Sequence, residues 1–86
     1  PQTGITIPLT QETITIGRSP QCSLFLNDMT VSRDHASVSP GHGGYIITDQ
    51  NSFNGVWVNN KNVVSHLLEP GDVIQIGSFC LVYQED

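Results

Sequence analysis

Short stretches of alternating apolar and polar residues recur along the chain. The apolar residues stand two positions apart, which is the period of a strand that buries one face. These stretches lie at Ile5/Ile7/Leu9, Ile14/Ile16, Ala36/Val38, Tyr45/Ile47, Val56/Val58, Ile74/Ile76 and Leu81/Tyr83. Turn residues separate them, among them Pro40-Gly41, Gly43-Gly44, Asn54-Gly55 and Pro70-Gly71. Many short strands with frequent turns predict an all-β sandwich or barrel.

One segment, residues 63–68, also fits a helix. Its apolar side chains follow the i, i+1, i+4, i+5 spacing of a helical stripe, at Val63, Val64, Leu67 and Leu68. The stretch is shorter than the roughly ten to twelve residues that favour a helix, and Pro70 closes it. We therefore expect a strand and an irregular approach to a type II turn, in which Gly71 follows Pro70 and supplies the positive φ.

The size of the chain limits it to one hydrophobic core. It has 86 residues, and a domain of this size buries only somewhat more than about 60% of its unfolded surface. We expect a single domain over residues 1–86. Because the sequence opens on Pro1 rather than on Met, we expect it to be a piece excised from a longer multidomain protein.

The charge balance excludes sequence-independent binding to nucleic acid. Eight acidic residues stand against Arg18, Arg33 and Lys61, and several cations are needed to neutralise a phosphate backbone. No apolar run approaches the ~20 residues that cross a bilayer, so we expect no membrane contact by this domain. Cys22 and Cys80 lack metal-ligand spacing and are expected to be free thiols, which favours a cytoplasmic setting. We expect no cofactor and no metal.

Three predicted loops hold most of the polar side chains that could fix a ligand. They are Gly17-Arg18-Ser19 after one strand, Ser32-Arg33-Asp34-His35-Ala36 before another, and Ser52-Phe53-Asn54-Gly55 before a third. Side chains placed where strands meet turns can converge at one end of a sandwich. Two of the three cations belong to these loops. We therefore expect a small anion site in an otherwise acidic domain.

The residue types in these loops suit a phosphorylated, extended peptide. An arginine guanidinium can hold a phosphate through two parallel charged hydrogen bonds, which a lysine cannot reproduce. A serine hydroxyl adds a directed donor. An asparagine side chain carries donors and an acceptor, so it can clamp the backbone N–H and C=O of a ligand as a neighbouring strand would.

Four runs of the sequence resemble, in order and spacing, the signature of the forkhead-associated (FHA) domain family. The runs are Ile16-Gly17-Arg18-Ser19-Pro20, Val31-Ser32-Arg33-Asp34-His35-Ala36, residues 51–59 and residues 68–77. The resemblance covers essentially the whole chain. It implies an eleven-stranded β-sandwich of two antiparallel-type sheets whose loops at one end bind phosphothreonine. The implied partner is a phosphothreonine-containing protein segment, from a Ser/Thr kinase or from its substrate.

The resemblance also implies which residues bind the peptide. Arg18 and Ser32 should contact the phosphate, and Asn54 the peptide backbone beside it. Arg33 and Phe53 complete the expected binding set. Arg33 is either a free surface cation or a contributor to the local positive field.

Three further residues are expected to support the site. The resemblance makes His35 structural, bracing the binding loops from beneath. Gly17 and Gly55 should give the backbone its turns, because glycine tolerates positive φ. For Asn54 followed by Gly55, a plain hairpin turn is the competing interpretation, since this pair is a common hairpin signal.

Two positions depart from the family pattern. Phe53 stands where threonine is usual, so a hydroxyl that often adds a phosphate contact is absent. Thr30 stands where some members carry a further basic side chain. Affinity or phosphate placement can differ from the family for these reasons.

No enzyme motif competes with this prediction. Ser32, Asp34 and His35 are the residue types of a hydrolytic triad, but a working relay is hard to build within four consecutive residues. The alternative function is a phosphate-independent interaction or self-association module that uses a sheet face around Trp57 and Phe53. Because Trp57 lies between two apolar strand residues, it faces the opposite side of its strand and is either a second core residue or an exposed contact.

Overall fold

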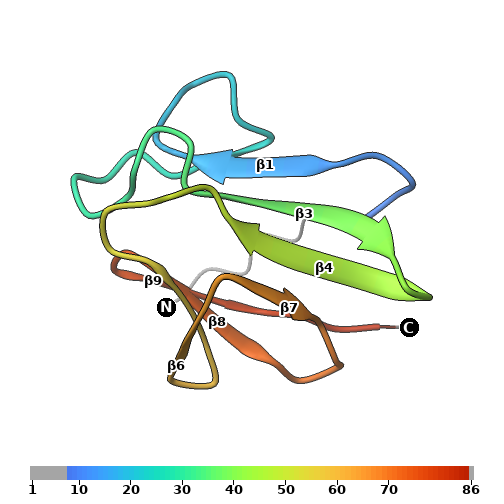
Figure 1. Cartoon of the computed structure of the whole chain (residues 1–86). Helices are drawn as coiled ribbons and strands as arrows, with labels where there is room; N and C mark the ends of the chain where they lie inside the picture. Colours follow the sequence, from blue (N-terminus) through green and yellow to red (C-terminus); the bar gives the residue numbers. More distant parts are fainter. Residues whose placement is uncertain (1–7, 86) are drawn as a thin grey trace.

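The computed structural model describes residues 8–85, which form two β-sheets (Figure 1). The strands in this range are β1 (Ile14–Gly17), β2 (Leu24–Phe25), β3 (Ala36–Gly41), β4 (Gly44–Asp49), β5 (Val56–Val58), β6 (Lys61–Val63), β7 (Ser65–Leu67), β8 (Val73–Ile76) and β9 (Phe79–Val82). One sheet has the order β2-β1-β3-β4-β7 and the other β6-β5-β8-β9. All pairs are antiparallel except β1 with β2.

The core lies between the two sheets. In the first sheet, Ile16 of β1 is opposite Ala36 of β3. In the second, Val56 of β5 is opposite Ile76 of β8. All four side chains are buried in one apolar cluster together with Ile47 of β4. The period-two pattern of the sequence therefore places one face of each sheet inside, as the alternation of side chains along a strand requires.

The predicted all-β sandwich is confirmed, but eleven strands are not. Nine strands lie within residues 8–85. Of the expected first stretch, Ile5 and Ile7 lie outside the described residues, and Leu9 belongs to no strand. The helical alternative for residues 63–68 is wrong, because β6 and β7 occupy this segment.

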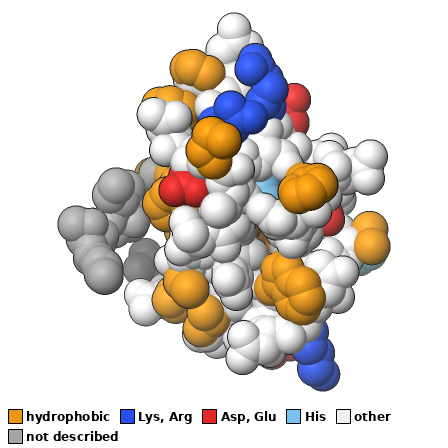
Figure 2. Space-filling model, turned by 90° about the vertical axis from the view of Figure 1, so that its left-hand side faces the viewer, with side chains coloured by type: hydrophobic (Ala, Val, Ile, Leu, Met, Phe, Trp, Pro, Cys, Tyr) orange, Lys and Arg blue, Asp and Glu red, His pale blue; other side chains and the backbone are white. Residues whose placement is uncertain are grey.

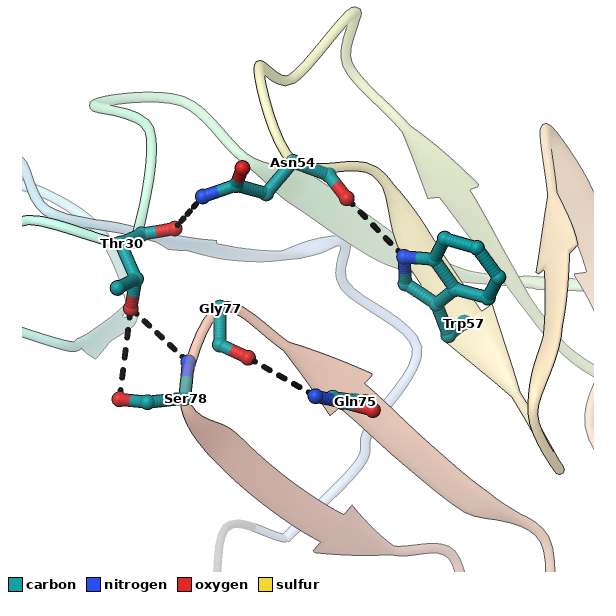
Figure 3. A pocket seen from close by; sticks show the side chains of 6 residues that line it. All are labelled: Thr30, Asn54, Trp57, Gln75, Gly77 and Ser78. Atoms are coloured by element: carbon teal, nitrogen blue, oxygen red, sulfur yellow. Dashed lines mark hydrogen bonds between the residues drawn. The ribbon is translucent and has the colours of Figure 1, made fainter.

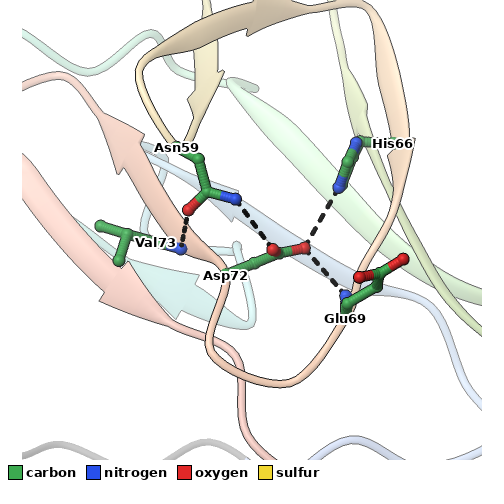
Figure 4. Close-up of polar contacts among 5 residues, drawn as sticks. All are labelled: Asn59, His66, Glu69, Asp72 and Val73. Atoms are coloured by element: carbon green, nitrogen blue, oxygen red, sulfur yellow. Dashed lines mark hydrogen bonds and ion pairs between the residues drawn. The ribbon is translucent and has the colours of Figure 1, made fainter.

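The expected turn before β8 is present and carries a polar cluster (Figure 4). Asp72 N–H donates to the carbonyl of Glu69 at 3.0 Å, and Gly71 has a φ of 91°. The buried Asp72 carboxylate accepts hydrogen bonds from Glu69 N–H at 2.8 Å and Asn59 Nδ2 at 2.9 Å, and it pairs with His66 Nε2 at 3.1 Å. The Glu69 N–H, followed by Asn59 and His66, holds the pKa of Asp72 below its ordinary value despite burial.

This cluster ties the second sheet to the first at one end of the strands. Asn59 follows β5, Asp72 precedes β8, and His66 belongs to β7 of the other sheet. Gly55 and Gly77 stand at the opposite ends of β5 and β8. Both cysteines are free thiols, as expected. Residues 8–85 contain no helix of the length and hydropathy needed to cross a membrane.

Candidate functional site

The three loops singled out in the sequence meet at one end of the sandwich, drawn at the left of Figure 1. The backbone N–H of Arg18 donates to the carbonyl of Ser32 at 2.9 Å, which joins the first loop to the second. The N–H of Phe53 donates to Ser32 Oγ at 2.9 Å, which joins the third. Figure 2 looks onto this end and shows basic side chains gathered along its upper edge, with separate patches of exposed apolar side chains.

Arg18 is oriented by its own loop neighbours. Its Nε donates to the carbonyl of Val31 at 3.0 Å. In the part of the chain that the structure describes, the one ion pair joins His66 to Asp72, so no acid neutralises Arg18. The guanidinium has further N–H groups on its two terminal nitrogens. These groups remain available to an anion held at this end of the sandwich.

Ser32 stands between the other two loops. Its Oγ accepts the hydrogen bond from Phe53 N–H, and its backbone N–H donates to His35 Nδ1 at 3.0 Å. A hydroxyl that accepts one hydrogen bond still carries its own proton and can donate it. The Ser32 hydroxyl therefore keeps a proton that it can donate while its oxygen holds the third loop.

His35 lies beneath the loops and is fully buried, with 0% of its surface exposed. Its Nε2 lies 2.8 Å from the carbonyl oxygen of Gly55. Because Nδ1 accepts from Ser32 N–H, the ring proton must sit on Nε2, where it donates to Gly55. The neutral ring thus ties the second loop to the third.

Asn54 and Gly55 form the turn that enters β5. Asn54 Nδ2 donates to the carbonyl of Thr30 at 2.8 Å, and its backbone carbonyl accepts from Trp57 Nε1 at 3.0 Å. Gly55 N–H donates to Ser52 Oγ at 2.9 Å, with a φ of 83° at Gly55. Asn54 is not among the residues with positive φ, so this is not the hairpin turn that Asn-Gly usually forms. The side-chain amide nitrogen of Asn54 is thus engaged within the loops.

Gly17 is required for a different reason than expected. We predicted positive φ at Gly17, but its φ lies outside that region. A Cβ at this position would overlap the backbone carbonyl of Arg33, with the carbonyl carbon only 2.8 Å away. Glycine is therefore needed at the end of β1 for close approach of two backbones.

The side chains of Arg33 and Phe53 are both exposed to solvent. Arg33 is exposed, and its backbone carbonyl accepts from Ser19 N–H at 3.2 Å. Phe53 has 93% of its surface exposed, and only its backbone takes part in the loop contacts named above. The sequence did not decide whether Trp57 faces the core or the solvent. In the structure it lies on the outer face of the second sheet, with 39% of its surface exposed. Trp57 is therefore not a core residue.

Thr30 connects the site to a fourth segment that sequence reasoning missed. Its Oγ1 donates to Asp28 Oδ1 at 2.5 Å and accepts from Ser78 N–H at 2.9 Å. The hydrogen bonds to Thr30 hold the pKa of Asp28 below its ordinary value. The spacing of Asp28 and Thr30 is that of an Asx turn, so the contact between these two residues has a local signal, whereas the contact of Thr30 with Ser78 has none.

A hollow of about 300 Å³ opens beside these contacts (Figure 3). It is lined by Thr30, Asn54, Trp57, Gln75, Gly77 and Ser78. No charged side chain belongs to the lining. The hollow therefore adjoins the loops through Thr30 and Asn54 and offers uncharged polar groups beside an indole ring.

Ser32, Asp34 and His35 do not form a hydrolytic triad in the structure. His35 Nδ1 receives the backbone N–H of Ser32 rather than its hydroxyl. The Ser32 Oγ is engaged by Phe53 N–H instead, and Asp34 is exposed. A general base must lie within hydrogen-bond reach of the nucleophile it activates. These three residues do not provide that contact.

A two-sheet sandwich with an arginine, a serine and an asparagine on adjoining loops at one end is the arrangement of a forkhead-associated domain. The FHA domain family model matches residues 14–77. The chain therefore belongs to the FHA domain family. The resemblance seen in the sequence is confirmed.

Known proteins agree with this assignment. The oxoglutarate dehydrogenase inhibitor of Corynebacterium efficiens is 43% identical over 83 residues, which cover 96% of this chain and 58% of that protein. A structure from a study of phosphothreonine-dependent FHA domain interactions matches with a TM-score of 0.91 at 32% identity, over 98% of this chain and 88% of that one. The FhaA FHA domain, solved in complex with the intracellular domain of Rv3910, matches with a TM-score of 0.87 at 34% identity, over 93% and 88%.

Proposed function

We propose that this domain binds phosphothreonine-containing segments of other proteins and does not catalyse a reaction. The observation that carries the proposal is the juxtaposition of Arg18 and Ser32. Their loops are joined by the 2.9 Å backbone hydrogen bond, and no acid in the described residues pairs with the guanidinium. A cation and a hydroxyl on two loops joined in this way, in a chain of net charge −5, can together serve as a local anion site.

Each binding residue has a separate role in this proposal. Arg18 holds the phosphate through its terminal N–H groups, and Ser32 donates its hydroxyl to the same phosphate. Asn54 contacts the peptide backbone next to the phosphothreonine, because its amide oxygen projects from the adjoining loop. Arg33 adds positive charge at the rim, and Phe53 offers apolar contact in place of a hydroxyl.

The partner we propose is a protein phosphorylated by a Ser/Thr kinase, or the kinase itself. This rests on the similarity to FHA domains studied for phosphothreonine-dependent interactions and to one complexed with the intracellular domain of another protein. The chain spans about 58% of its relative from Corynebacterium efficiens, an inhibitor of oxoglutarate dehydrogenase. We propose a similar regulatory role for the whole protein, acting through binding rather than catalysis.

A degenerate phosphothreonine peptide library tests this function and returns the sequence preference together. The wild-type domain should retain a subset of phosphorylated peptides. Arg18→Ala should retain none of them, whereas Lys61→Ala should behave as the wild type, since Lys61 lies on β6 outside the loops. Equal retention by Arg18→Ala and the wild type would remove Arg18 from the site.

A second candidate function is phosphate-independent protein binding. Large apolar side chains exposed to water are the observation that favours it: Phe53 and Met29 have 93% of their surface exposed, and Trp57 39%. Large exposed apolar side chains are frequent at protein–protein contacts, and here they form separate patches rather than one surface (Figure 2). This function predicts that Trp57→Ala weakens capture of a partner while Arg18→Ala does not. The reverse pattern is expected if phosphate drives binding.

A further inference from the structure

Asn54 and Gly55 are the one Asn-Gly pair in the sequence. This pair is chemically labile, because glycine has no Cβ to keep its backbone nitrogen from approaching the preceding side chain. In the reaction, Gly55 N forms a bond to Asn54 Cγ and releases its proton to solvent. The Cγ–Nδ2 bond breaks, and the amide nitrogen takes up a proton from solvent and leaves as ammonia. Water then opens the cyclic imide to aspartate or isoaspartate at position 54.

The structure holds both the nucleophile and the leaving group of this reaction in hydrogen bonds. Gly55 N–H, the nucleophile, donates to Ser52 Oγ at 2.9 Å. The leaving group, Asn54 Nδ2, donates to the carbonyl of Thr30 at 2.8 Å. The two backbone carbonyls of the pair are held as well, that of Asn54 by Trp57 Nε1 at 3.0 Å and that of Gly55 by His35 Nε2 at 2.8 Å.

We propose that Asn54 is a latent deamidation site inside the peptide-binding loops, and that the Ser52 hydroxyl guards it. Cyclisation requires the Gly55 N–H to leave Ser52 Oγ and the Asn54 amide to leave the carbonyl of Thr30. The reaction therefore proceeds only from a locally opened loop. Asn54 is exposed to solvent, so the water that completes the reaction has free access once the loop opens.

Deamidation at this position would inactivate the site, a consequence that rests on the proposed function. The product has a carboxylate in place of the amide, so the hydrogen bond to the carbonyl of Thr30 is lost. The new negative charge lies on the loop that Phe53 N–H joins to Ser32. It would repel a phosphate bound there. The isoaspartate product also adds a methylene group to the backbone between Asn54 and Gly55.

The rate of deamidation of the 86-residue chain, followed by mass spectrometry in mildly alkaline buffer, tests directly whether the Ser52 hydroxyl slows the reaction. We expect Ser52→Ala to deamidate at position 54 about two- to twelve-fold faster than the wild type in native buffer, the range that corresponds to loss of one hydrogen bond. In denaturant the two proteins should react at the same, faster rate. Peptide mapping assigns the site, and Ser65→Ala, an exposed serine on β7, should match the wild type.

The variant Asp72→Asn distinguishes local opening of the loop that carries Asn54 from unfolding of the whole domain. It weakens the fold at the ends of β5 and β8 remote from Gly55. Under the proposal it leaves the native deamidation rate unchanged. Equal acceleration of deamidation by Asp72→Asn and Ser52→Ala would show that the hydrogen bond from Gly55 N–H to Ser52 Oγ does not protect Asn54. A deamidation rate of the native wild type as fast as that of the denatured protein would show the same. If Ser52→Ala accelerates deamidation as expected but Asn54→Asp still retains phosphothreonine peptides, deamidation does not inactivate the site and the binding role of Asn54 is wrong. If the undamaged wild type retains no phosphothreonine peptide, the proposed function fails while the deamidation result stands.

Discussion

His35 Nε2 donates to the carbonyl oxygen of Gly55 at 2.8 Å while Nδ1 receives the N–H of Ser32, so one buried ring fixes the spacing of two binding loops. Removing this ring leaves both backbone groups without a partner. His35→Ala should therefore lower stability by about 1–3 kcal/mol and weaken peptide binding as well. Thermal melting and peptide titration measure the two effects.

The exposed His42→Ala is the matched control for the loss of an imidazole. It should change neither quantity. A His35→Ala protein that melts like the wild type but fails to bind would show that His35 contacts the ligand and does not brace the loops.

Gly17→Ala should destabilise the fold through overlap with the backbone of Arg33. The added methyl group meets backbone atoms, which cannot rotate aside as a flexible side chain would. Overpacking of this kind costs about 1–3 kcal/mol, and occasionally more. Gly44→Ala is the matched control, because its Cβ would meet only Leu67 Cδ1 at 3.5 Å. Denaturant titration should show a loss for Gly17→Ala and little change for Gly44→Ala, and equal stability of the two would contradict the close approach.

Asp72 should make the free energy of unfolding of the domain depend on pH in the acidic range. Its pKa in the fold is lowered, chiefly by the hydrogen bond from Glu69 N–H. The folded state therefore favours the ionised carboxylate. This contribution is fully present above the ordinary value of 3.8 and is lost as pH falls through the lowered pKa.

Asp72→Asn should reduce stability at neutral pH by about 1–3 kcal/mol and flatten the acid limb of the stability curve. Unfolding measured from neutral pH to below 3.8 follows both effects. Asp34→Asn, which removes an exposed acid, controls for the change in net charge. An unchanged acid limb in Asp72→Asn would mean that other carboxylates set the acid dependence.

Phosphothreonine should bind more tightly than phosphoserine. Burial of one methyl group contributes on the order of 0.8 kcal/mol, and discrimination by one methylene in a tight pocket reaches about 1–3 kcal/mol. We therefore expect a several-fold to hundred-fold preference between peptides that differ only in this methyl group. Equal affinity would mean that the loops hold the phosphate without enclosing the side chain that carries it.

The period-two pattern predicted most of the sandwich because it reports burial on one face directly. Ile14 and Ile16, for example, are both buried within β1. The pattern missed β2, since this strand has two residues and one of them, Phe25, is exposed. Its parallel pairing with β1 depends on the path of the chain, which alternation does not encode.

The candidate site was predictable as a set of loops but not as a network. Motif spacing placed Arg18, Ser32 and Asn54 on neighbouring loops, and the structure brings these loops together. The contact of Thr30 with Ser78 joins residues 48 positions apart, so no local pattern could have indicated it. The demand for glycine at position 17 likewise comes from the backbone of Arg33, which only the folded chain brings close.

Calorimetry with one peptide in two forms, phosphorylated and unphosphorylated at a single threonine, tests phosphothreonine recognition most directly. The phosphorylated form alone should bind, with an affinity that falls with salt and as pH drops through the second phosphate pKa near about 6. Arg18→Ala should lose about 2–5 kcal/mol of that binding energy, whereas its stability should fall by no more than the roughly 0.5–1.5 kcal/mol of the Nε hydrogen bond to Val31, because Arg18 lies on a loop outside the core. Equal binding of the two peptide forms would contradict the account.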